Sequence, residues 1–213
     1  SFYKVEDGKR KFYDISSSSY KNIPGSDAFI ILENHSNNIV WKNSGTHLID
    51  IGDGVLNLEF KTKMNTIGGE VLDAIPKSIE LAEKNFAGLV IGNQGENFSA
   101  GANLAMMLML AIEQEYDELS MACKMFQNAS MRIRYSSIPV VVAPHHLTLG
   151  GGCEFCLHAD RVQAAAETYI GLVEFGVGII PAGAGSKEMA LRASNAYQEG
   201  EIEFPELQKR FLN

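Results

Sequence analysis

Between residues 28 and 193 of this 213-residue chain, segments whose hydrophobic positions are spaced as in strands alternate with segments spaced as in helices. Short apolar runs predict β-strands, and one of them shows the period of two that is typical of strands, through Leu56, Leu58 and Phe60. The predicted strands are Phe29–Leu32, Ile39–Trp41, Val55–Phe60, Ala87–Ile91, Val140–Ala143 and Arg161–Ala166.

The segments between these runs have the spacing of helices. Val71, Leu72, Ile75 and Ile79 recur at helical intervals, although Pro76 is expected to kink or interrupt that helix. The apolar segment Leu104–Ile112 leads into a long amphipathic helix, and two shorter helices are expected further on. These three helices are predicted at Glu115–Arg134, Cys153–His158 and Ser186–Ala193. Strands that alternate with helices indicate an α/β fold with mostly parallel pairing.

Residues 1–27 differ from the rest of the chain. Lys9, Arg10 and Lys11, the serine run Ser16–Ser19 and the Pro24-Gly25 turn make a polar opening without helical or strand periodicity. We therefore expect residues 1–27 to be a linker or the tail of a preceding domain, followed by one core domain at residues 28–213. Because the chain begins at Ser1 without methionine, a processed form or an excised fragment is expected.

Composition narrows the class of protein. The net charge of −8 disfavours a nucleic acid or an anionic membrane as partner, and the four acidic residues Glu199, Glu201, Glu203 and Glu206 are expected to form a solvated tail. Three cysteines are too few for a disulfide framework, and no opening segment resembles a signal peptide. The longest apolar run is far shorter than the roughly 20 residues that span a bilayer. We expect a cytoplasmic protein that is not in a membrane.

Two segments share the order strand, glycine-containing turn, helix: Ala87–Leu104 and Val140–His158. The first amides of a helix lack intrahelical partners, and glycine lets a ligand approach the backbone closely. Two such turns that face each other would offer two N–H groups to one developing oxyanion. A single turn of this kind is more often purely structural, so the hypothesis depends on the pair.

Two carboxylates accompany these turns. Glu154 follows the triple glycine Gly150–Gly152, where it would also favour the helix dipole, and Glu174 lies 20 residues on in an apolar setting. A carboxylate among apolar residues is costly unless it has a function. Two carboxyl groups beside an oxyanion hole fit the addition or removal of water across a carbon–carbon bond.

Three motifs, in order along the chain, resemble those of the enoyl-CoA hydratase (crotonase) family. They are Phe98-Ser-Ala-Gly-Ala-Asn103, then Leu149-Gly-Gly-Gly-Cys-Glu154 after Ser137–Ala143, and Leu172-Val-Glu174 with Gly178-Ile-Ile-Pro-Ala-Gly183. The resemblance covers about Val55 to Ala193. The resemblance is strongest to the hydratase module of fused bacterial proteins that also carry an NAD-dependent 3-hydroxyacyl-CoA dehydrogenase. Phe2–Tyr13 resembles the stretch that joins the two halves of those proteins.

This resemblance implies a crotonase-like (ClpP/crotonase) spiral of β-β-α units, here without its C-terminal helical region. It implies reversible hydration of 2-enoyl-CoA to 3-hydroxyacyl-CoA in fatty-acid β-oxidation, in the cytoplasm. The expected partners are an acyl-CoA thioester and, as the family implies, further subunits of a trimer. No metal is expected, and no cofactor beyond the coenzyme A that is part of the substrate. The implied site consists of catalytic Glu154 and Glu174, oxyanion amides at Ala102 and Gly151, and substrate-binding Lys63, Met64, Ala100, Asn103, Leu104 and Gly150.

Departures from the family pattern keep alternatives open. Asn103 stands where the family usually has Asp, His145-His146 replaces a small or turn-forming pair, and Ala182 replaces a glycine. The alternatives are an enoyl-CoA isomerase and a truncated fragment without catalytic activity. Two unrelated interpretations of Cys153-Glu-Phe-Cys156 also exist: a thioredoxin-like redox motif at a helix start, and a zinc site together with His145, His146 and His158.

Overall fold

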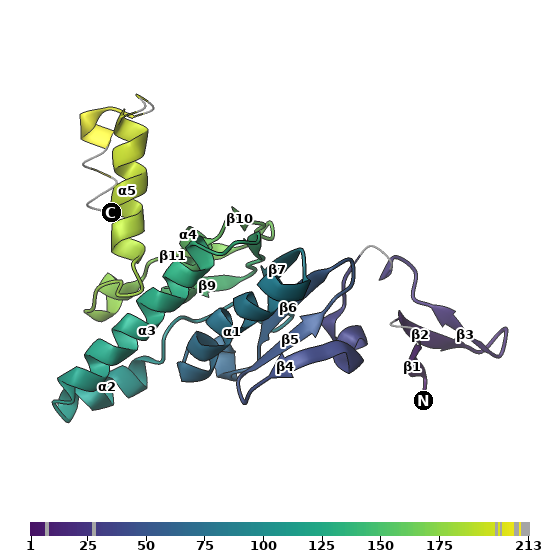
Figure 1. Ribbon diagram of the computed structural model, residues 1–213. Helices are drawn as coiled ribbons and strands as arrows, with labels where there is room; N and C mark the ends of the chain where they lie inside the picture. The colour runs from purple at the N-terminus through teal and green to yellow at the C-terminus, as the bar shows by residue number, and fades with distance from the viewer. Residues whose placement is uncertain (7–8, 27–28, 199, 201, 207–208, 210–213) are drawn as a thin grey trace.

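The computed structural model describes residues 1–6, 9–26, 29–198, 200, 202–206 and 209. Its centre is a six-stranded sheet of order β10-β8-β7-β6-β5-β4, covered by helices (Figure 1). The strands of this sheet are β4 (Ile39–Lys42), β5 (Thr46–Asp50), β6 (Val55–Phe60), β7 (Gly88–Ile91), β8 (Val140–Val142) and β10 (Arg161–Val162).

The sheet is mixed in direction. From β6 to β10 all neighbouring strands are parallel, whereas β4, β5 and β6 form an antiparallel meander. The expectation of mostly parallel pairing is therefore confirmed for the half of the sheet that leads to the helices. Strand β5 was not predicted, and β10 is shorter than the predicted Arg161–Ala166.

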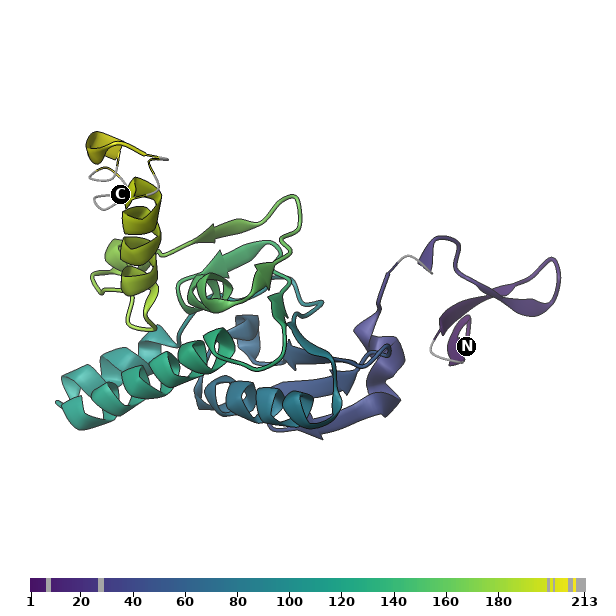
Figure 2. The same ribbon diagram turned by 45° about the horizontal axis from the view of Figure 1, so that its top comes forward.

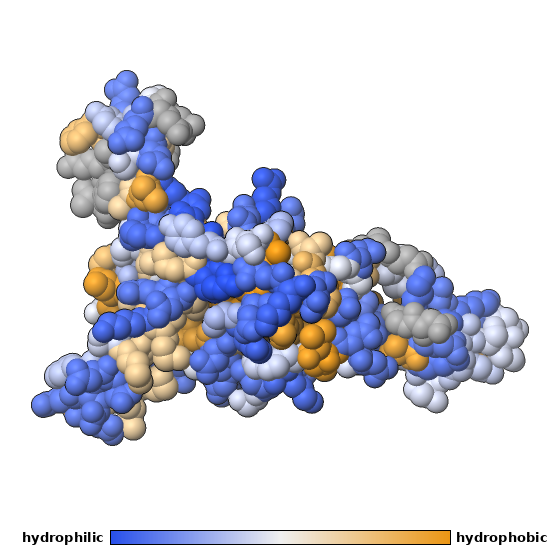
Figure 3. Space-filling view, viewed as in Figure 1, coloured by the Kyte–Doolittle hydropathy of each residue, from blue (hydrophilic) through white to orange (hydrophobic). Residues whose placement is uncertain are grey.

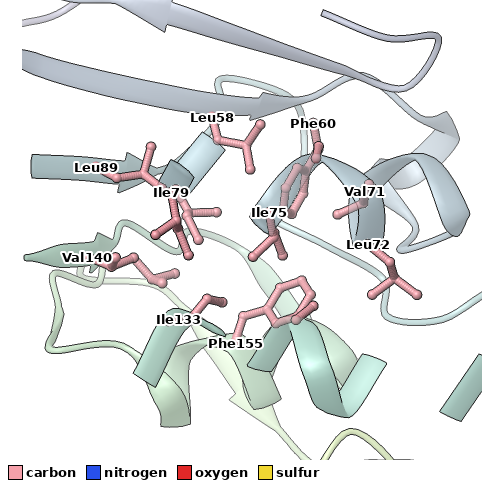
Figure 4. Packing of buried hydrophobic residues seen from close by; sticks show 14 of the residues in the cluster. Leu58, Phe60, Val71, Leu72, Ile75, Ile79, Leu89, Ile133, Val140 and Phe155 are labelled. Carbon is pink, nitrogen blue, oxygen red and sulfur yellow. The ribbon is translucent and has the colours of Figure 1, made fainter. Parts of the chain in front are cut away.

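Helices cover the sheet and close the hydrophobic core. They are α1 (Gly69–Asn85), α2 (Leu104–Ile112), α3 (Tyr116–Arg134), α4 (Gly151–His158) and α5 (Gly185–Gln198). Helix α1 packs on β5, β6 and β7, and α3 packs along α1 and α4. Ile75 and Ile79 of α1 meet Leu58 and Leu89 of the sheet, while Phe155 of α4 closes the core from the other side (Figure 4). Burial of these side chains is the main force that fixes the helices on the sheet.

Pro76 does not interrupt α1. The helix runs continuously from Gly69 to Asn85 with the proline on an exposed position, and the four predicted apolar positions all lie on its buried face. Packing of that face therefore outweighs the local cost of the N–H that Pro76 lacks. Helix propensity alone would have predicted that the helix ends at this proline.

A second, two-stranded sheet joins β9 (Leu147–Leu149) to β11 (Tyr169–Gly171) in parallel. Two short 3₁₀ helices, η3 (Lys63–Asn65) and η4 (Glu174–Val177), follow β6 and β11. Because β11 pairs with β9, the segment after β11 is carried to the turn that precedes α4. This pairing is what positions Glu174.

The opening of the chain is regular, although its polar, turn-rich sequence predicts no helix or strand there. β1 (Tyr3–Glu6), β2 (Lys9–Asp14) and β3 (Ser19–Asn22) form a three-stranded antiparallel sheet that lies to one side of the main sheet (Figures 1 and 2). Its role as the tail of a preceding domain stays a prediction. The predicted strand Phe29–Leu32 is also wrong, because Leu32 starts a 3₁₀ helix, η2 (Leu32–Asn38).

Helix α5, near the C-terminus, is longer than predicted. The helix continues past the expected end at Ala193 to Gln198 and projects from the body of the molecule in Figure 2. Glu199 and Glu201 of the predicted acidic tail, like Ala28 at the predicted domain start, lie outside the described residues. Within the described part of the chain, no helix combines the length and apolar content that crossing a membrane requires.

Candidate active site

The two glycine turns predicted from the sequence lie against each other. Ser99, before α2, pairs in parallel with Thr148 of β9: the Ser99 amide donates to the Leu147 carbonyl at 3.0 Å, and the Leu149 amide donates to the Ser99 carbonyl at 3.0 Å. This short ladder fixes the register between Ala100–Asn103 and Gly150–Gly152. The backbone there tolerates no side chain at Gly101, where φ is +86° and a Cβ would lie 3.0 Å from the Leu149 oxygen.

Ala102 and Gly151, the residues predicted to supply the oxyanion amides, lie on the two adjoining turns. In the part of the chain that the structure describes, neither donates a hydrogen bond to a protein acceptor. Gly151 is the first residue of α4, so its N–H has no intrahelical partner, and a Cβ on Gly101 would come within 3.6 Å of its nitrogen. Two unpaired N–H groups on adjoining backbones are the elements of an oxyanion hole.

Glu154 lies on α4 with its side chain almost fully buried, at 2% exposure. Its Oε1 accepts a hydrogen bond of 2.8 Å from the amide of Gly185, at the start of α5. Glycine is required beside it, since a Cβ on Gly183 would lie only 2.3 Å from Oε2. Burial raises the pKa of Glu154 to about 7, helped by the nearby charge of Glu174 and opposed by the Gly185 and Gly183 amides. The carboxyl group can therefore hold or release a proton near neutral pH.

Glu174 opens η4 and is 9% exposed. Its Oε2 has no hydrogen-bond partner within the described residues, and a Cβ on Gly150 would lie 3.0 Å from its Oε1. The Gly150 amide donates to the Gly171 carbonyl at 2.9 Å, which holds β11 and the carboxyl group against the glycine turn. Burial raises the pKa of Glu174. An unpartnered buried carboxyl oxygen is costly, so its presence indicates a function.

A cavity of about 400 Å³ joins these groups. Eight of the predicted site residues line it: Ala100, Ala102, Asn103, Leu104, Gly150, Gly151, Glu154 and Glu174. The remainder of its wall is mostly apolar. Met106 of α2 and Ile180 are exposed members of this wall. Figure 3 shows hydrophobic side chains gathered on the part of the surface where α2 and α3 lie. A cavity with an apolar wall and few polar groups is typical of a site for a largely apolar ligand.

Lys63 and Met64 are the predicted site residues that do not line this cavity. Both are exposed on η3, and Met64 has a positive φ of 55°. The segment is nevertheless adjacent, because the Ala100 amide donates to the Met64 carbonyl at 3.2 Å. Their contact with a coenzyme A arm outside the cavity stays a prediction.

Sequence reasoning missed one wall of the cavity. Helix α3 contributes Met121, Cys123 and Phe126, and the loop before α5 contributes Ala182 and Gly183. The only signal for α3 was its amphipathic pattern, which does not distinguish a face that packs on the core from one that lines a cavity. The close fit of Gly183 against Glu154 depends on contacts between segments almost 30 residues apart.

The two other interpretations of the cysteines are not supported. Cys153 and Cys156 are buried, and burial raises the pKa of the Cys153 thiol to about 12, whereas a redox-active cysteine needs a stabilised thiolate. Burial also raises the pKa of Cys156. No group of three or more potential metal ligands occurs among the residues that the structure describes, so a zinc site with the histidines has no geometric basis there.

The raised pKa of Glu154 predicts that this residue destabilises the protein at neutral pH. Between pH 4.5 and about 7 the folded protein binds a proton that the unfolded chain has released, so folding stability falls as pH rises through this range. Glu154→Gln should remove this dependence and raise the free energy of unfolding above pH 7 by about 1–3 kcal/mol relative to wild type. Urea unfolding at pH 4.5 and 8 measures the difference. Glu80→Gln, at an exposed position of α1, should show no such gain.

Comparison with known proteins gives a consistent result. Residues 50–196 match the family model described as enoyl-CoA hydratase/isomerase. The Bacillus subtilis (strain 168) protein named "Probable 3-hydroxyacyl-CoA dehydrogenase" is 47% identical over 191 residues, covering 89% of this chain and 24% of that protein. A Rickettsia felis protein named "Putative fatty acid oxidation complex trifunctional enzyme" is 34% identical over 155 residues, covering 73% of this chain and 21% of that protein.

A solved structure agrees at the level of the fold. The enoyl-CoA hydratase from Polaromonas sp. JS666 superposes with a TM-score of 0.65 at 26% identity, over 68% of this chain and 57% of that one. The chain spans less than a quarter of the length of the Bacillus and Rickettsia relatives described above. The family match covers more than two thirds of the chain and includes both turns and both carboxylates. This protein belongs to the enoyl-CoA hydratase/isomerase family and has its crotonase-like α/β fold.

Proposed function

We propose that this chain carries out the reversible hydration of a 2-enoyl-CoA to a 3-hydroxyacyl-CoA. The observation that carries the proposal is one buried carboxyl pair, Glu154 and Glu174, in an apolar cavity that Ala102 and Gly151 also line, two residues whose amides have no acceptor among the described residues. Both carboxyl groups have raised pKa values because they are buried. Burial favours the protonated form of each group, and hydration needs one protonated and one ionised group.

In the proposed reaction, the amides of Ala102 and Gly151 bind the thioester oxygen. The carboxylate of Glu154 takes a proton from water as the water oxygen bonds to C3, and the C2–C3 π electrons move onto C2 and the thioester oxygen as an enolate. Glu174 donates its proton to C2, which restores the thioester. A net H and OH are added, and proton exchange through solvent resets the pair. Stabilisation of the enolate oxygen by such amides typically contributes about 10²–10³ in rate.

The wider setting is also a proposal. The names of the Bacillus and Rickettsia relatives suggest that the parent protein acts in fatty-acid β-oxidation and also carries 3-hydroxyacyl-CoA dehydrogenase activity. The 3-hydroxyacyl-CoA made here would be the substrate of that dehydrogenase. We further propose a cytoplasmic location, an assembly of the trimeric type, and no cofactor besides the coenzyme A of the substrate.

Two assays test the function. The purified chain is incubated with 2-butenoyl-CoA, and the loss of the conjugated thioester absorbance is followed together with mass detection of the hydrated product. Binding of acetyl-CoA is measured separately by calorimetry. Hydration with saturable acetyl-CoA binding is the expected result. Conversion of a 3-enoyl-CoA to the 2-enoyl form without hydration would identify an isomerase instead, and binding without any turnover would indicate a non-catalytic chain.

A further inference from the structure

Glu188 is a further buried carboxylate, which the proposed reaction does not use. Glu188, on the first turn of α5, is fully buried, and cations from two helices surround it. Its Oε2 lies 2.7 Å from Nη2 of Arg134 on α3 and 3.8 Å from Nε of Arg192, and its Oε1 lies 2.8 Å from Nζ of Lys187. Burial opposes ionisation of Glu188, but these ion pairs outweigh it and lower its pKa. Glu188 is therefore ionised.

A buried histidine connects this carboxylate to the helix of Glu154. His158, one turn after Glu154 on α4, has its Nδ1 2.7 Å from the backbone carbonyl of Glu154. A carbonyl only accepts, so Nδ1 carries the hydrogen. The other ring nitrogen, Nε2, lies 3.7 Å from Oε1 of Glu188 and has no hydrogen-bond partner among the described residues. Glu188 thus contacts α3 and α4 from its place on α5.

The position of Glu188 along α5 links this cluster to the active site. Helix α5 begins at Gly185, whose amide donates the 2.8 Å hydrogen bond to Oε1 of Glu154. The amide of Glu188 in turn donates to the Ala184 carbonyl at 3.0 Å, in the same first turn. Whatever fixes Glu188 therefore fixes the donor that orients Glu154.

We propose that Glu188 is a positioning residue: held by Arg134 and packed against His158, it keeps the start of α5 in place so that the Gly185 amide stays on Glu154. An apolar contact would hold two helices together about as well as a buried ion pair. The charged cluster adds directionality, because a carboxylate between fixed donors allows little rotation or sliding of the helix. This inference rests on the proposed function only for its effect on turnover.

Two substitutions separate positioning from electrostatics. Glu188→Gln removes the negative charge, which by electrostatics alone would lower the pKa of Glu154 or leave it unchanged. Glu188→Asp keeps the charge but withdraws the carboxylate by one methylene from Arg134. Positioning predicts that both variants weaken the Gly185 hydrogen bond, and since that bond lowers the pKa of Glu154, both should raise it.

The pKa of Glu154 is measured by NMR titration of carboxyl-labelled glutamates, with Glu154→Gln to assign its signal. Both Glu188 variants should titrate at higher pH than wild type, with a kcat for 2-butenoyl-CoA hydration lower by about tenfold or more and a KM changed far less. Glu80 is an exposed ion-pair residue on α1, and Glu80→Gln should change neither the pKa of Glu154 nor the kinetic constants.

A Glu154 signal that stays in place or moves to lower pH in the Glu188 variants would overturn the proposal. A lower melting temperature with an unchanged Glu154 titration would show that Glu188 only stabilises the fold. Because the titration requires no turnover, it still decides the question if the wild-type chain does not hydrate enoyl-CoA. In that case the proposed function is wrong, and the titration alone decides whether Glu188 positions Glu154.

Discussion

Glu174→Gln is expected to lower the rate of 2-enoyl-CoA hydration by about 10²–10⁴-fold, the range typical for loss of one general acid or base. Glutamine keeps the size of the side chain and its place beside Gly150, but its amide does not transfer a proton to C2 at useful rates. Burial raises the pKa of Glu174, which favours the protonated form that the proposed donor needs. Stopped-flow or steady-state measurement of the hydration rate tests this expectation.

Substrate binding should survive the same change. Acetyl-CoA affinity, measured by calorimetry, is expected to stay within about threefold of wild type, because the proposed binding contacts come mostly from the apolar wall and the two amides. Glu96→Gln is the matched control: it makes the same substitution on an exposed turn away from the cavity and should leave the rate unchanged. Hydration by Glu174→Gln at the wild-type rate would exclude Glu174 as the proton donor.

The sequence predicted the elements whose patterns are dictated by burial. Val55–Phe60, Val140–Ala143 and the face of Val71, Leu72, Ile75 and Ile79 all correspond to strands and a helix of the structure, because each belongs to the core. Elements with little buried surface were missed or misplaced, and so was the buried strand β5, whose apolar pair Leu48-Ile49 is too short to show a period. The strands of residues 3–22 carry mostly polar side chains, and antiparallel pairing with their neighbours decides their conformation.

The candidate site was predictable to a similar degree. The turns around Gly101 and Gly151 and the two glutamates were identified from motifs, and the structure brings them together around one cavity. The contribution of α3 and the fit of Gly183 and Gly185 around Glu154 were not foreseen, because they arise from contacts between segments far apart in the sequence. The buried Glu188 was equally invisible, since an acidic residue on a short helix is usually exposed.

Gly151→Ala should reduce the hydration rate by about 10²–10³-fold, the usual cost of losing one oxyanion donor. A Cβ on Gly151 would lie 2.5 Å from Cζ of Phe126 and 3.1 Å from Cδ1 of Ile67. The Phe126 ring lines the cavity but stacks on Phe155 with ring centroids 5.0 Å apart, so moving it away disturbs this contact. We expect the start of α4 to shift as well, and the Gly151 amide to shift with it.

Helix propensity sharpens this test, because alanine is favoured over glycine inside a helix by about 1 kcal/mol. A loss of activity in Gly151→Ala therefore has to come from the displaced amide and the steric conflict with Phe126. Gly171→Ala is the control, since a Cβ there meets nothing within 4 Å, and it should retain the wild-type rate. A weaker affinity for a stable enolate-like inhibitor, with acetyl-CoA affinity changed less, is expected for Gly151→Ala. Equal losses for both ligands would instead mean that the alanine blocks the cavity, leaving the role of the amide unsupported.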